Sequence, residues 1–208
     1  FDEVGIKFAT GLTLSLATVG TGRTATSAVA AFQASDVGRE IWSGPGVAKI
    51  TAYTSTTVVT VEVVTVFSGT ALTAWQLRGS PQTTCTASAK DPVGTVITLT
   101  LGAAGWRADD VGKFVKINRG LVEITVYSSA TVVSGIIRAA LDATVASPAN
   151  AWSLEAAVWN ADDGYPCTGT LHEQRLVAAG SPGYPQTIWE SRTGEYLNFE
   201  LGTKDDDA

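Results

Sequence analysis

Side chains suited to catalysis are few in this 208-residue chain, which contains a single histidine, His172. A hydrolytic triad would have to use that imidazole as its general base. No serine lies in a G-x-S-x-G sequence, the sharp turn that exposes the nucleophile in one large class of hydrolases. His172 lies in the strand-like run LHEQRL, so we expect a structural side chain there and no triad.

Paired carboxylates are the second candidate chemistry, because a glycosidase needs two of them at a set separation. The neighbouring aspartates are Asp109 with Asp110, Asp162 with Asp163, and the run 205–207. Asp110 has a counterpart 74 residues earlier at Asp36, which favours a repeated capping role for both. The run 205–207 lacks the glycine and the spaced ligands of a calcium loop. We therefore predict no enzyme, no bound metal and no cofactor.

The sequence GTGRTA at residues 20–25 formally matches the glycine fingerprint of dinucleotide-binding folds, with Glu40 near its acidic position. That fingerprint requires a helix after the glycines. The residues that follow are rich in Ser, Thr and small side chains, and they occupy the place of the strand-like VITLTL in the second half of the chain. We predict a glycine turn and no nucleotide site.

Composition and charge limit the function further. The net charge of −6 is spread along the chain without a Lys/Arg cluster, so nucleic acid is not an expected tight ligand. The longest apolar run, VVTVEVVTVF, is too short for a membrane-spanning helix. Cys85 and Cys167 fit neither a disulfide framework nor a four-ligand zinc site, and we expect two free thiols. Since the chain contains no Met, we expect it to be a piece of a longer protein.

The chain contains an internal sequence repeat, and the elements of that repeat determine where these side chains lie. At an offset of 74 residues, ASDVGREIWSGPGVAKITAYTSTTVV (34–59) aligns without a gap with ADDVGKFVKINRGLVEITVYSSATVV (108–133), and 12 of the 26 positions are identical. Each copy then ends on Trp-x-Leu, at Trp75 and at Trp152. The repeat predicts two equivalent modules.

Within each copy the apolar residues alternate with polar ones, which predicts strands with one buried face. Lys49 and Glu123, matched positions of opposite charge, are predicted to face water. Gly46 and Gly120 are predicted to lie in turns that need a positive φ. The positions predicted to face inward are Ala48, Ile50, Ala52, Val59, Val61 and Val63 in the first copy and Val122, Ile124, Val126, Val133, Gly135 and Ile137 in the second.

No window sustains a helical apolar stripe, apart from a single turn in AFQASDVG and in GWRADDVG. Asp36 and Asp110 are expected to cap these turns before Gly38 and Gly112 lead into a strand. The predicted fold is therefore all-β. It has two tandem small antiparallel β-barrels or sandwiches of about five to seven strands each, at residues 1–80 and 81–157, and a different segment at 158–208.

The final segment contains the ordered pattern GYP, QRL, PQTIW, GEY and NF from Gly164 to Phe199. This pattern resembles the tail nozzle or tail-stabilisation (tail tube) proteins of short-tailed bacteriophages and prophages. The D-V-G-[RK] turn and the closing W-x-L upstream resemble the small β-modules that often precede it. The resemblance implies that residues 158–208 begin a β-propeller-like domain, left incomplete, with strands near 170–178 and 187–192 and a weakly ordered end after Gly202.

The resemblance also implies a function. It is that of a structural virion component, assembled in the host cytoplasm, which helps to build the DNA-exit tube and attaches adaptor and fibre proteins. DNA would only pass through the lumen, no membrane would be involved, and the complete protein would form a homo-oligomeric ring. The expected structural anchors are Asp36, Gly38, Trp75, Asp110, Gly112 and Trp152 from the repeat, and Tyr165, Pro166, Arg175, Trp189, Tyr196 and Phe199 from the resemblance.

Two other functions remain open on the sequence. A carbohydrate-binding or adhesion module of a phage or bacterial surface protein would be favoured if Trp42 or Trp159 were exposed beside polar residues in a groove. A tail-associated glycosidase would require acidic side chains that converge in a cleft.

Overall fold

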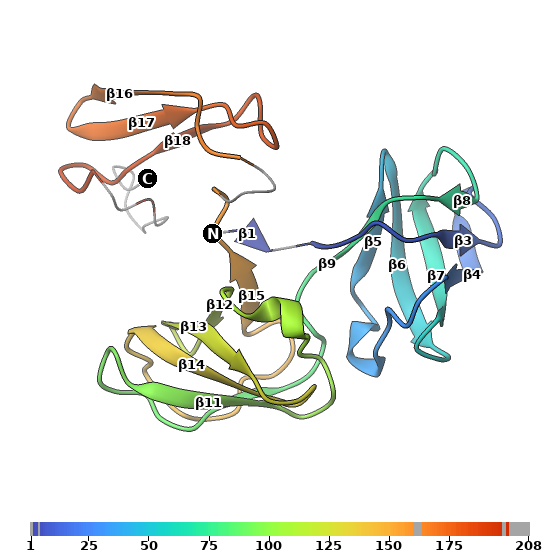
Figure 1. The fold of residues 1–208 in the computed structure, drawn as a ribbon, viewed down its shortest axis with the longest axis horizontal. Helices are drawn as coiled ribbons and strands as arrows, with labels where there is room; N and C mark the ends of the chain where they lie inside the picture. The colour runs from blue at the N-terminus through green and yellow to red at the C-terminus, as the bar shows by residue number, and fades with distance from the viewer. Residues whose placement is uncertain (1, 4, 160–163, 197–198, 200–208) are drawn as a thin grey trace. The chain divides into compact units, whose positions relative to one another are not determined.

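The computed structural model describes residues 2–3, 5–159, 164–196 and 199 (Figure 1). The predicted all-β class is confirmed: antiparallel sheets curl into half-barrels. The helical elements in the described ranges are two 3₁₀ turns, η1 (Ala34–Asp36) and η2 (Ala108–Asp110), at the two positions where the sequence predicts a single turn. The chain divides into two compact units, residues 1–156 and 157–208.

The first unit contains two sheets, which define two modules. The first module consists of β2 (Ile6–Phe8), β3 (Leu12–Leu14), β4 (Gly20–Ser27), β5 (Glu40–Ser43), β6 (Gly46–Tyr53), β7 (Val58–Thr65), β8 (Ala71–Leu72) and β9 (Trp75–Arg78). The second consists of β10 (Cys85–Ala87), β11 (Val96–Leu101), β12 (Phe114–Ile117), β13 (Gly120–Tyr127), β14 (Val132–Ala139) and β15 (Ser153–Ala156), with β1 (Asp2–Glu3) added at its edge.

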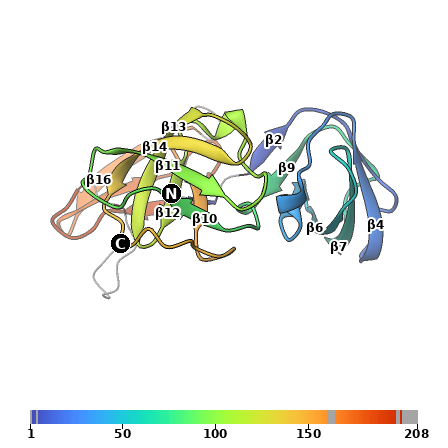
Figure 2. The ribbon, with the colours of Figure 1, turned by 90° about the horizontal axis from the view of Figure 1, so that it is seen from below.

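Both sheets have the same strand order. The first runs β2-β9-β5-β6-β7-β4-β3-β8 and the second runs β1-β15-β12-β13-β14-β11-β10. Each strand of the second sheet occupies the place of its counterpart in the first, and β8 alone has no match. Figure 2 shows β4, β6 and β7 side by side in the first module and β11, β13 and β14 side by side in the second. The duplicated sequence thus folds into a duplicated sheet.

The N-terminal segment contributes an edge strand to each sheet. β2 pairs with β9 of the first module, whereas β1 pairs with β15 of the second. Because β1 lies within the residues predicted for the first module, a boundary drawn along the sequence at residue 80 does not follow the sheets. An antiparallel edge accepts any extended segment with free backbone groups, so this crossing has no signature in residue type.

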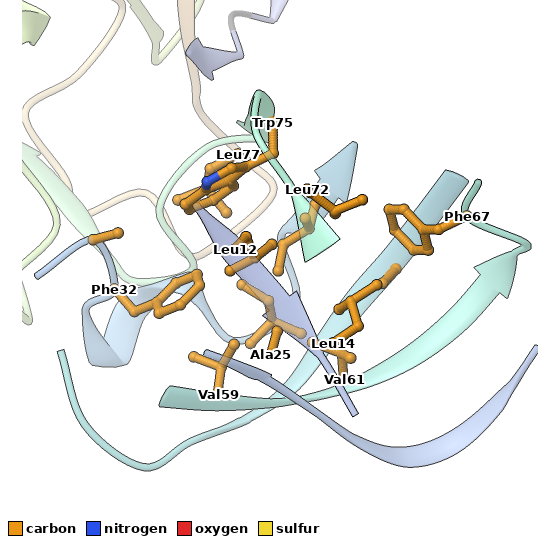
Figure 3. Packing of buried hydrophobic residues seen from close by; sticks show 14 of the residues in the cluster. Leu12, Leu14, Ala25, Phe32, Val59, Val61, Phe67, Leu72, Trp75 and Leu77 are labelled. Atoms are coloured by element: carbon orange, nitrogen blue, oxygen red, sulfur yellow. The ribbon is translucent and has the colours of Figure 1, made fainter. Parts of the chain in front are cut away.

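Each module has its own apolar core, built from the alternating positions that the sequence predicts. Figure 3 shows buried side chains of the first core, among them Leu12, Phe32, Trp75 and Leu77. The three valines of β7, at positions 59, 61 and 63, are fully buried, and Val133 and Ile137 of β14 are too. The prediction for these two strands is confirmed.

Two matched positions depart from the predicted alternation. Ala52 and the equivalent Val126 are exposed, although both were predicted to face inward. A β-bulge shifts the register just before each of them, between Ile50 and Ala52 and between Ile124 and Val126. The extra residue reverses which face the following side chain occupies.

The matched glycines Gly46 and Gly120 begin β6 and β13 and do not have the positive φ predicted for them. The left-handed turn residues lie just before, at Gly44 in the first module and at Asn118 and Arg119 in the second. Crowding explains the glycines instead. A Cβ on Gly46 would lie 2.2 Å from the Phe67 ring, and one on Gly120 would lie 2.6 Å from a backbone oxygen.

The second unit is a three-stranded antiparallel sheet in the order β16-β17-β18, formed by β16 (Thr168–His172), β17 (Arg175–Ala179) and β18 (Ile188–Glu190). The strand predicted at 170–178 is in fact a hairpin. Glu173 and Gln174 both have positive φ and form its turn without the glycine or asparagine that would have indicated it. The predicted end after Gly202 lies outside the described residues.

Replacing Trp75 or Trp152 by Ala is expected to lower the free energy of unfolding by about 3–5 kcal/mol. Both indoles are almost fully buried, and each donates its Nε1–H to a matched carbonyl, that of Thr10 at 3.0 Å and that of Thr83 at 2.9 Å. Denaturant unfolding followed by circular dichroism measures the change. Val64→Ala, at a half-exposed side chain, is the control, with an expected change within about 0.5 kcal/mol. Wild-type stability in either Trp variant would contradict the prediction.

Candidate functional site

The 3₁₀ turns place the two predicted capping aspartates in equivalent positions. In η1, Asp36 Oδ2 accepts the Gln33 backbone N–H at 2.8 Å, and in η2 Asp110 Oδ2 accepts the Arg107 N–H at the same distance. Each carboxylate also binds the basic residue three positions later: Arg39 Nη1 and Lys113 Nζ lie 2.8 Å from the respective Oδ1 atoms.

The glycines after these turns have the conformation expected of them. Gly38 has a φ of +100° and Gly112 a φ of +88°, in the left-handed region that favours glycine. Their N–H groups both donate to the neighbouring hairpin, to the carbonyl of Ile50 and to that of Ile124. The D-V-G motif therefore joins a capped turn to the sheet in both modules.

Arg107 joins the two modules, a role that the sequence did not predict. Its Nη2 donates to Asp36 Oδ2 at 2.8 Å and to the Ala31 carbonyl at 2.7 Å. In the opposite direction, Gln33 Nε2 donates to the Trp106 carbonyl at 3.4 Å. Gln33 and Arg107 are matched positions of the repeat. In each module, the side chain at this position donates a hydrogen bond to the other module.

The resulting cluster of charges is excluded from water. The side chain of Asp36 is 0% exposed, that of Arg39 1% and that of Arg107 12%. Burial lowers the pKa of the Arg39 guanidinium, and the carboxylate of Asp36 opposes that change. Because a buried charge without its partner is unfavourable by several kcal/mol, the cluster fixes how the modules meet.

A groove of about 350 Å³ lies on the first module beside Trp42. Its lining includes side chains from three neighbouring strands, among them Lys7 of β2, Trp42 of β5 and Gln76 and Arg78 of β9. Trp42 is half-buried, and the Arg78 Cζ atom lies 4.4 Å from the centroid of its ring. A saccharide-binding module was expected to have an exposed Trp42 beside polar residues in a groove; the groove and its polar residues are present, whereas the indole is half-buried.

Trp159 belongs to a different arrangement. Its ring packs edge-on against Trp189 and Phe199, with centroids 5.7 and 5.0 Å away. Tyr184 in turn contacts Trp189 at 6.3 Å. These rings form the small apolar centre of the second unit, so two of the anchors implied by the resemblance, Trp189 and Phe199, lie together.

The remaining anchors implied by the resemblance lie outside this aromatic cluster. Arg175 Nη1 donates to the Ser191 carbonyl at 3.2 Å, which ties β17 to the end of β18. Pro166 is half-buried. Tyr165 and Tyr196 are exposed, so the second unit does not bury them.

The glycine-rich stretch and His172 form no common site within the described residues. GTGRTA lies in strand β4, not in a turn before a helix. His172 is exposed, and its nearest acidic partner is the neighbouring Glu173 at 3.9 Å. No group of three or more His, Cys, Asp or Glu side chains in the described part of the chain could hold a metal ion. Asp162, Asp163 and the run 205–207 lie outside the described residues.

Comparison with known proteins gives no assignment: no protein-family model matches the chain, and no curated protein matches it significantly. Over the residues that the structure describes, no helix has the length and apolar character needed to cross a membrane.

Replacing Asp36 by Asn is expected to lower the free energy of unfolding by about 3–5 kcal/mol, because it leaves a buried guanidinium without its counter-charge. Denaturant unfolding measures this. The matched control is Asp142→Asn, whose carboxylate pairs with Arg119 at 3.7 Å in solvent, and its expected change is within about 0.5 kcal/mol. Equal changes in the two variants would show that the buried cluster is not stabilising.

The two cysteines, both free thiols, are expected to differ in reactivity. Burial raises the pKa of the Cys85 thiol to about 12, so at pH 8 it stays protonated and enclosed, whereas Cys167 is exposed. Ellman's reagent should titrate one thiol per folded chain and two after unfolding. Cys167→Ser should remove the fast reaction. A fast reaction that persists in that variant would place Cys85 at an accessible site.

Proposed function

We propose that this chain is a structural part of a phage tail nozzle, where tandem β-modules and the start of a propeller-like domain help to form the DNA-exit tube. The observation that carries the proposal is that the buried charges form the contact between the two modules. Arg107 of the second module pairs with Asp36 of the first, which also pairs with Arg39, and the three side chains are 0–12% exposed, as expected of a scaffold whose modules must keep one orientation.

Two further features support a structural role. The resemblance of the final segment to nozzle proteins supplies the biological context, with adaptor and fibre proteins as partners. The net charge of −6 suits a surface past which DNA moves, because acidic side chains repel phosphate and reduce adhesion of the passing strand.

The surface of the second unit supports the propeller assignment. Leu171 of β16 and Ile188 of β18 are 66% and 65% exposed, and Tyr165 is 64% exposed. Apolar side chains on a small sheet with free edges favour contact with further strands. In the proposed nozzle, the next strands and blades of the same protein cover them.

The deciding experiment locates the protein in virions. Particles purified from the source phage or induced prophage should contain the protein, and antibodies raised against residues 1–156 should label the tail. The neighbouring reading frames should encode portal, adaptor and fibre proteins. Virions that lack the protein, or labelling confined to the capsid, would overturn the proposal.

Amide hydrogen exchange tests the propeller assignment separately. Residues 168–192 should exchange more slowly in a longer form of the protein that includes the following strands than in this chain, because the added strands would pair with its edges. The amides of β6 and β13 serve as the internal control and should be equally protected in both forms. Equal protection of residues 168–192 in both forms, with the chain monomeric at all concentrations, would contradict the assignment.

A further inference from the structure

We propose that the groove beside Trp42 binds a saccharide that carries a single carboxylate, such as a uronic or nonulosonic acid residue. This binding function is additional to the proposed structural role and does not depend on it. The volume of about 350 Å³ lies at the lower end of the range of about 300–1,000 Å³ found for ligand sites. The groove therefore suits a short sugar segment.

Strand pairing places the polar groups of the groove in one row. Lys7 of β2 lies opposite Gln76 of β9, and Gln76 lies opposite Trp42 of β5 on its other side. The adjacent row, centred on Leu77, is buried in the core. Because successive side chains of a strand point to opposite faces, the row at Gln76 forms part of the outer surface.

The aromatic and cationic groups of the groove are held before any ligand binds. Trp42 donates its Nε1–H to Glu40 Oε2 at 2.8 Å, which fixes the indole. Arg78 Nε donates to Gln76 Oε1 at 3.0 Å, and its guanidinium lies over the Trp42 ring. A ligand that contacts both groups therefore loses little side-chain entropy on binding.

Arg78 supplies the donors that would recognise a carboxylate. Its Nε is occupied by Gln76, and no acceptor in the described part of the chain takes the N–H groups of its terminal nitrogens. A planar pair of donors matches the two oxygens of a carboxylate. Glu40 lies directly opposite Arg78, so a second negative charge on the ligand would be repelled. The site thus favours one carboxylate over a polyanion.

The remaining lining favours a sugar over an acidic peptide. The groove combines the aromatic rings of Trp42 and Phe8 with the amide of Gln76 and the hydroxyl of Ser43, groups that suit the C–H faces and the hydroxyls of a sugar ring. A peptide that binds a sheet usually pairs with the backbone of an edge strand. Here the groove spans side chains of three strands, including β9, which is paired on both sides.

The second module shows that the fold does not require these residues. The positions matched to Trp42, Gln76 and Arg78 are occupied by Lys116, Ser153 and Glu155, although the strands β12 and β15 pair in the same way. The second module thus lacks the aromatic ring, and an acid replaces the arginine. The site belongs to the first module alone.

The test titrates the whole chain with methyl β-D-glucuronoside and with its neutral counterpart, methyl β-D-glucoside. Binding is followed by the NMR signal of the Trp42 indole N–H, assigned by its loss in Trp42→Phe. The acidic glycoside should shift this signal saturably, with a millimolar Kd, and the neutral glycoside should bind at least tenfold more weakly. Arg78→Gln should raise the Kd for the acidic glycoside at least tenfold, a loss of about 1.4 kcal/mol.

Two variants keep this result interpretable. Arg78→Lys retains the charge without the planar donors, and its Kd should lie between those of wild type and Arg78→Gln. Arg119→Gln, at an exposed arginine of the second module, should leave the Kd unchanged. Equal affinity for the two glycosides, no saturation up to about 100 mM, or an unchanged Kd in a folded Arg78→Gln variant would each overturn the proposal. Tighter binding of tetraglutamate than of the glucuronoside would also overturn it, in favour of an acidic peptide.

Discussion

The carboxylate of Asp36 is the point on which the arrangement of the first unit depends. It closes its own 3₁₀ turn, neutralises Arg39 within the same module and receives Arg107 from the other module. The two guanidinium groups stabilise the ionised form of the Asp36 carboxylate, and the carboxylate in turn stabilises them. In surroundings of low dielectric constant, an unpaired ion is far less stable than a paired one. Local chain reversal and the contact between modules are therefore coupled through one side chain. The matched Asp110 has only the first two of these contacts, so the two copies are not equivalent at their most similar motif.

The sequence predicted the parts of the fold that depend on local alternation and on the repeat. The buried valines of β7 follow from their spacing of two, and the identical strand order of the modules follows from the ungapped alignment. What it missed depends on distant atoms or on backbone conformations without a residue signature. Gly46 is small because Phe67 approaches from another segment, and Val126 is exposed because a bulge precedes it.

Charged side chains illustrate the same limit at the candidate sites. The capping by Asp36 could be predicted because it acts within four residues, whereas the partner of Arg107 lies 71 positions away. Gln33 and Arg107 are matched but not identical, and that difference within a strong repeat is the signal that could have pointed to the contact. The replacement of Trp42 by Lys116 is a difference of the same kind. In a duplicated chain, the positions that are identical in both copies indicate the shared fold. The positions that differ indicate where the two copies have separate roles.

The crossing of the N-terminal segment between the two sheets has a consequence for synthesis on the ribosome. Asp2 pairs with Ala156 and Ile6 pairs with Leu77, so the partner of β1 is made about 150 residues after it. At about 5–20 residues per second, that segment waits on the order of ten seconds or more for its place in the second sheet. During this interval β15 does not yet exist, and the first module can form without β1. The pairing of β1 with β15 is therefore a late step in the assembly of the first unit, although β1 is synthesised before all the other strands of that sheet.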